Sequence, residues 1–95
     1  MYVVLAISKD KEDGKVFVDT MGFCETRKEA NDEMEALHNS DLNELLDYYG
    51  HDSAIGRNLV KNSHIEDDQA WTSFNGNDRS VHFLVLGEHE EQYLG

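Results

Sequence analysis

Two apolar runs near the ends of the chain constrain its fold more than any other feature. Residues 2–8 and residues 81–86 carry apolar side chains at both odd and even positions. A strand that is apolar on both faces usually lies in the interior of a sheet. We therefore expect these two strands to lie side by side in the middle of one sheet, although they are far apart in the sequence.

Each apolar run also belongs to a hairpin. The Asp13-Gly14 pair follows the first strand and is a strong turn signal, and residues 16–21 return as a second strand. Asp19 interrupts that strand, so we place it nearer the edge of the sheet. Near the other end, residues 75–78 join a strand over 70–74 to a strand over 79–86.

The segment between the hairpins has helical spacing. Thr26 with Glu29 matches a capping box, and Ala30, Met34 and Leu37 follow as an apolar stripe, so the first helix should end at residue 38 or 39. We expect Ser40 or Asp41 to cap a second helix that ends at Gly50. A third, short helix is indicated over residues 53–62, whereas residues 62–68 are polar and read as a loop.

These elements predict an α+β fold for one small domain, residues 1–87, followed by an acidic, partly disordered tail, residues 88–95. The element order is ββαα(α)ββ. We expect a four-stranded, mainly antiparallel sheet in the order 2-1-4-3, with the helices on one face. The opposite face would then expose apolar residues of the two central strands, and a homodimer would bury them. The alternative is that a curled sheet or the tail covers this face.

The charge of the chain limits its partners. Its 95 residues contain 20 Asp and Glu against 8 Lys and Arg, a formal net charge of −12. Such a surface repels phosphates, so we expect no direct binding of nucleic acid. No run of 18 apolar residues is present, and we expect no membrane span. Cys24 is the single cysteine, which excludes an internal disulfide and favours a reducing, cytoplasmic setting.

Most of the carboxylates fall in residues 25–52 and 66–95. Within the predicted helices they turn away from the apolar stripe, and few lysines interleave with them. A row of this kind resembles the charge along a nucleic-acid backbone and would attract a basic groove. The alternative is a solvated face that only keeps the protein soluble. The predicted partner-binding residues are Glu29, Asp32, Glu33, Glu35, Glu44, Asp47 and Tyr48.

Catalytic and metal-binding patterns are weak. His64 precedes three carboxylates and His89 is flanked by others, but neither spacing matches an established metal site, and we expect no cofactor. Cys24 next to Glu25 fits a small packed residue better than a nucleophile. We therefore expect a protein that is not an enzyme.

The sequence predicts a small acidic inhibitor that binds a basic DNA- or RNA-binding protein as a nucleic-acid mimic. Phages encode many chains of this size and charge, which by analogy suggests an anti-CRISPR or anti-restriction role against a defence nuclease. Two other functions stay open. One is a structural or regulatory homodimer that works through the uncovered sheet face, and the other is a small metal-dependent enzyme or sensor.

Overall fold

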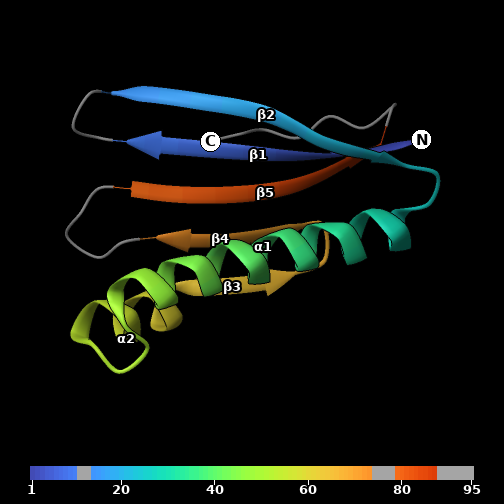
Figure 1. Ribbon diagram of the computed structural model, residues 1–95. Coiled ribbons are helices and arrows are strands. Elements are labelled where there is room, and N and C mark those ends of the chain that lie inside the picture. Colours follow the sequence, from blue (N-terminus) through green and yellow to red (C-terminus); the bar gives the residue numbers. More distant parts are fainter. Residues whose placement is uncertain (11–13, 74–78, 88–95) are drawn as a thin grey trace.

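The computed structural model describes residues 1–10, 14–73 and 79–87 of the chain. Five strands form one antiparallel sheet in the order β2-β1-β5-β4-β3, and two helices complete the fold (Figure 1). Their bounds are β1 Tyr2–Asp10, β2 Lys15–Cys24, α1 Arg27–Tyr49, α2 Ala54–Lys61, β3 Ser63–Glu66, β4 Gln69–Ser73 and β5 Arg79–Gly87. The α+β class is confirmed, and so is the central pairing of the first strand with the last.

The structure corrects the expected sheet at one point, because it has five strands rather than four. Residues 63–66 form β3, which pairs with β4 at the edge of the sheet, where a loop was expected. Three of its four residues are exposed, so this strand needs no apolar pattern. The expected turn at 75–78, residues 11–13 and the tail 88–95 lie outside the described residues.

The expected helix boundary at Ser40 and Asp41 is wrong. α1 continues unbroken from Arg27 to Tyr49, capped by Thr26, whose hydroxyl accepts a hydrogen bond from the Glu29 amide at 3.1 Å. Inward-facing residues recur every four positions along the whole helix, which keeps one stripe against the sheet. That row consists of Ala30, Met34, His38, Leu42 and Leu46.

The short third helix is confirmed as α2. Its cap is Ser53, whose hydroxyl accepts from the Gly56 amide at 3.0 Å and donates to the Gly50 carbonyl at 2.7 Å. Gly50 has a φ of +93°, which a residue with a Cβ rarely adopts. It ends α1 and lets the chain turn into α2.

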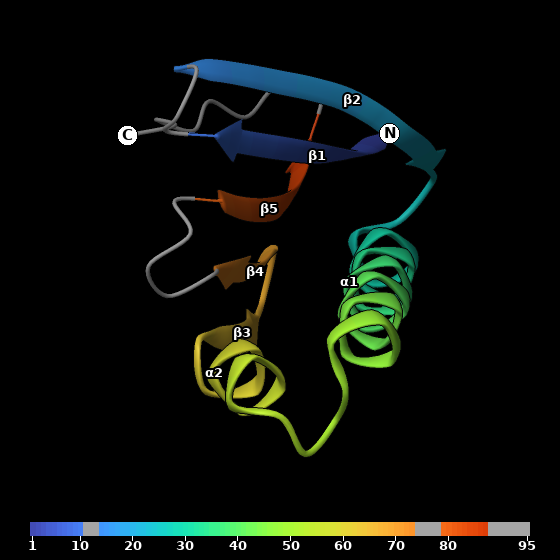
Figure 2. The same ribbon diagram turned by 60° about the vertical axis from the view of Figure 1, so that its left-hand side comes forward.

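The core lies between α1 and one face of the sheet (Figure 2). Ala30 and Met34 from α1 pack with residues of β1, β4 and β5. The sheet contributes Val4, Ala6, Ala70, Phe83 and Val85.

The other face of the sheet differs from expectation. Ile7 and Leu84 point to this side, yet only 5% and 2% of their surface is exposed. Each is flanked on the same face by side chains of both neighbouring strands, as Ile7 is by His82 and Val18. Val3, Leu5 and Leu86 on the same face are half-buried. The central described strands thus expose less apolar surface than expected, and the sheet's most exposed apolar residues lie on β2 instead.

Candidate binding site: an acidic groove beside helix α1

The structure places all seven predicted partner-binding residues on α1, and all seven are exposed. Since the helix rises about 1.5 Å per residue, Glu29 and Asp47 are roughly 27 Å apart along one axis. The carboxylates do not form an even row, because no exposed acid lies between residues 36 and 43. The helix therefore carries one acidic cluster near its start, Glu29, Asp32, Glu33 and Glu35, and a second near its end, Glu44 and Asp47, beside the aromatic Tyr48.

A groove of about 630 Å³ opens beside the first cluster. Asp32 and Glu35 of α1 line one side, and the turn between β3 and β4 lines the other. That turn supplies Glu66 and Asp67, which are more than 30 positions further along the chain. We call this feature the acidic groove. The part-exposed Ile65 adds apolar surface to it, whereas Met34 lies buried beneath the groove.

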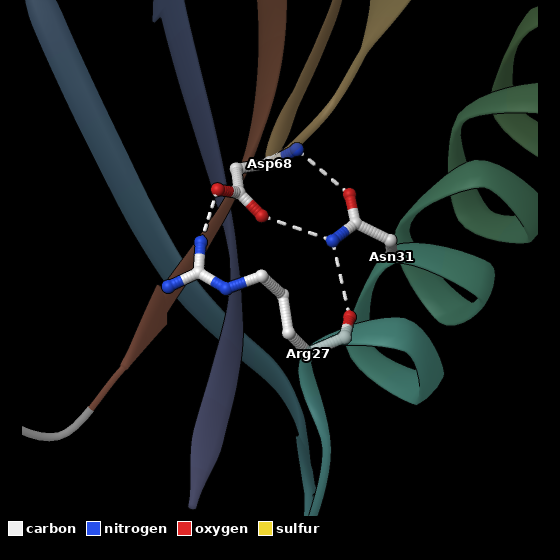
Figure 3. Close-up of polar contacts among 3 residues, drawn as sticks. All are labelled: Arg27, Asn31 and Asp68. Atoms are coloured by element: carbon white, nitrogen blue, oxygen red, sulfur yellow. Dashed lines mark hydrogen bonds and ion pairs between the residues drawn. The ribbon is translucent and has the colours of Figure 1, made fainter.

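A polar network holds the two sides of the acidic groove together (Figure 3). The Asn31 side chain donates to Asp68 Oδ1 at 2.9 Å and to the Arg27 carbonyl at 3.0 Å, and it accepts from the Asp68 amide at 2.7 Å. Arg27 forms an ion pair with the same Asp68 carboxylate. Asp68 adopts a φ of 68°, so its backbone turns the hairpin at this point. The network fixes the β3–β4 turn against the first turns of α1.

The charges in the acidic groove are unbalanced. Five carboxylates and two cations line it, and both cations are engaged within the protein. Lys28 pairs with Asp32 at 2.8 Å, and this hydrogen bond, with the charge of Asp32, raises the pKa of Lys28. Glu35, Glu66 and Asp67 form no ion pair with a lysine or arginine among the described residues.

The chemistry of the acidic groove suits a basic side chain. Lysine and arginine combine an apolar stem with a cationic head, and such side chains lay the stem on apolar surface while the head reaches polar groups. Here Ile65 offers the apolar surface, and Glu35, Glu66 and Asp67 offer the acceptors. The groove therefore has the chemistry to receive a cationic side chain.

The second acidic cluster is more open. Asp47 contacts His51 Nε2 at 2.8 Å. The Tyr48 ring is 81% exposed and stands edge-on to Tyr49, with 4.8 Å between ring centroids. Tyr48 is thus available to a partner, as the sequence suggested.

The other candidate residues form no site within the described parts of the chain. Within residues 1–10, 14–73 and 79–87, no group of three or more His, Cys, Asp or Glu side chains is placed to share a metal ion. His64 contacts Glu66 at 3.4 Å and packs on Trp71, with 4.7 Å between rings. Cys24 is a half-buried free thiol. His89 lies outside the described residues.

Sequence reasoning missed Glu66 and Asp67 as members of the acidic groove. The sequence associates them only with His64, as a weak cation cluster, because their segment is polar and predicts a loop. No local pattern could have found them, since their position depends on β3 pairing with β4 and on Asn31 holding the turn.

Comparisons with known proteins add no assignment. No protein-family model, curated protein or solved structure matches the chain. Neither described helix is long and apolar enough to cross a membrane.

Proposed function

We propose that this protein is a non-enzymatic binding protein that presents the acidic groove and the outer face of α1 to a basic, nucleic-acid-binding protein. The observation that carries the proposal is the acidic groove itself. Carboxylates from two distant segments line both of its sides, and three of them have no lysine or arginine partner among the described residues. The stability of the fold does not explain this arrangement, because bringing like charges together costs free energy.

In this proposal the partner is a nucleic-acid-binding protein, and the small acidic protein inhibits it. A surface that binds phosphates is rich in arginine and lysine, and the same side chains fit the acidic groove. The two acidic clusters of α1 distribute negative charge over roughly 27 Å of the helix, and this charge would steer the two proteins together. A defence nuclease of the kind targeted by anti-CRISPR or anti-restriction proteins is the specific form that we favour.

Capture with DNA as a competitor tests this proposal. The immobilised protein is incubated with a nuclease-treated cell extract, and bound proteins are eluted with duplex DNA or with chloride salt at the same ionic strength. We expect DNA to release bound proteins that the matched salt leaves in place. If DNA and matched salt release the same proteins to the same extent, mimicry of nucleic acid is wrong.

A matched pair of variants locates the binding surface. Glu35→Gln with Asp67→Asn removes two charges from the acidic groove, whereas Glu25→Gln with Asp52→Asn removes two exposed charges elsewhere. Both variants have the same net charge. We expect the groove variant to lose capture and the control to keep it. Equal loss in both would mean that only the total charge matters.

A further inference from the structure

β2 is an edge strand with exposed apolar side chains on both of its faces. It is ten residues long and ends the sheet on the side opposite β3 (Figures 1 and 2). Val16, Phe17 and Val18 are each between 55% and 57% exposed, and Phe23 is 68% exposed. The pairing with β1 places Phe17 on the face that carries α1, and it places Val16 and Val18 on the other face.

Within the described residues, this edge carries few of the usual protections against pairing with another strand. Proteins blunt edge strands by keeping them short, by bulges, by proline, or by charged side chains. β3, at the other edge, has only four residues, and three of them are exposed. β2 is long, the chain contains no proline, and the register shift opposite Val4 and Leu5 leaves residues 15–20 regular. The charged residues of β2 are Lys15 and Asp19.

We propose that a second copy of this chain pairs with β2 in antiparallel fashion, along residues 15–19, around a two-fold axis at Phe17. Such an axis runs perpendicular to the sheet, so each residue faces one on the same side of the partner strand. Val16 then lies opposite the partner subunit's Val18, and Phe17 lies opposite the partner subunit's Phe17. Lys15 lies opposite the partner subunit's Asp19.

Neighbouring registers lack this complementarity. An axis at Val18 would place Phe17 opposite the partner subunit's Asp19. An axis at Asp19 would bring the two Asp19 carboxylates together, and like charges directly opposite destabilise a strand pair. The sequence of residues 15–19, Lys-Val-Phe-Val-Asp, is thus self-complementary in one register: apolar against apolar on both faces, and opposite charges at both ends.

The exposed apolar surface within residues 15–19 suits a small, weak interface. Taking about 150–250 Å² for a whole aromatic side chain and less for a valine, the exposed parts of Val16, Phe17 and Val18 sum to roughly 300 Å² per copy. Two copies therefore offer about 600 Å² of apolar surface, to which the paired backbones add, and this area is typical of weak, reversible association. The product would be a continuous sheet of two copies, joined at β2.

Charge gives this self-association a recognisable salt dependence. Each copy carries a net charge of −12, so the two repel one another, and salt screens this repulsion. Pairing through β2 should therefore strengthen as salt is added, whereas binding of a basic partner to the acidic groove should weaken. The two proposals do not depend on one another, and either can fail alone.

Sedimentation equilibrium of the full chain, at low and high sodium chloride, tests the pairing. We expect a monomer–dimer equilibrium whose Kd falls as salt rises. Val18→Asp should raise the Kd at least about tenfold, while Val60→Asp, the same change at an equally exposed valine on α2, should leave it unchanged. A monomer at every salt concentration, or equal effects of both substitutions, would overturn the proposal.

An exchange of charges tests the register and does not depend on the folding of the valine variant. Lys15→Glu or Asp19→Lys alone places like charges opposite one another twice per dimer and should raise the Kd. The double variant Lys15→Glu with Asp19→Lys restores opposite charges and should return the Kd to that of the unaltered protein. If the double variant dimerises no better than the single ones, the axis at Phe17 is wrong.

Discussion

Asn31 offers the sharpest test of how the acidic groove is held together. Replacing it by alanine removes two hydrogen bonds to Asp68, at 2.9 and 2.7 Å, and leaves the Asp68 amide without that acceptor. Each neutral hydrogen bond contributes about 1 kcal/mol to stability, and one to a carboxylate contributes more. Alanine has a better helix propensity than asparagine by about 0.5 kcal/mol, which offsets part of this loss. We expect Asn31→Ala to lower the free energy of unfolding by about 1–3 kcal/mol.

Thermal unfolding followed by circular dichroism measures this loss. For a domain of this size each kcal/mol shifts Tm by about 4–8 °C, so we expect a fall of roughly 5–20 °C. Asn39→Ala is the control, because Asn39 is an exposed residue of the same helix whose side chain makes no hydrogen bond within the described part of the chain. Its Tm should stay unchanged or rise slightly. If both variants shift Tm by the same amount, the network does not hold the turn.

Three further predictions concern packing and buried ionisable groups. Burial lowers the pKa of His38 below its ordinary 6.5, so the folded state binds fewer protons than the unfolded state. The free energy of unfolding, measured with urea, should therefore fall as pH drops below about 6.5. In His38→Leu this fall should be smaller, and a fall of the same size would contradict the prediction. Burial, with the charge of Glu44, raises the pKa of Asp41 above 3.8, which means that the charged carboxylate destabilises the folded state. Asp41→Asn should therefore raise the midpoint of urea unfolding at pH 7 but not below pH 3.8. No gain at pH 7 would refute this prediction. A Cβ on Gly56 would lie 2.2 Å from the Gly50 carbonyl oxygen, so Gly56→Ala should lower the stability measured by thermal unfolding by about 1–3 kcal/mol. Gly22→Ala is the control, because a Cβ there meets open space, and it should lower stability far less. Equal losses would count against the close approach at Gly56.

The order of four of the five strands could be predicted from local patterns, whereas the exposed edge strand β3 could not. Alternation and doubly apolar runs identified β1 and β5, and their pairing followed from the need to bury both faces of each. The expected division of α1 at Ser40 or Asp41 is wrong, because a residue type that can cap a helix can also lie inside one. In the structure His38 is buried edge-on to Phe83, with 6.3 Å between ring centroids, and it carries the inward-facing row from Met34 to Leu42.

The candidate site could be predicted only in part. Exposure of the α1 carboxylates follows from helical periodicity, which the sequence shows. The acidic groove needs a long-range contact, the one between Asn31 and Asp68, and no spacing in the sequence encodes it. The edge position of β2, by contrast, follows from Asp19 and from the expected strand order, and the structure confirms it. The exposure of apolar residues on both of its faces is visible only in the structure.

The most direct test of the central claim is to map where a basic ligand contacts the protein. Backbone amide chemical shifts of the isotope-labelled protein are followed by NMR while an arginine-rich peptide is added. We predict that shift changes concentrate at residues 31–35 and 65–68, on the two sides of the acidic groove, and that Glu35→Gln with Asp67→Asn removes them. Shift changes spread evenly over all exposed carboxylates, with Glu25 and Asp52 moving as much as Glu35, would contradict the account.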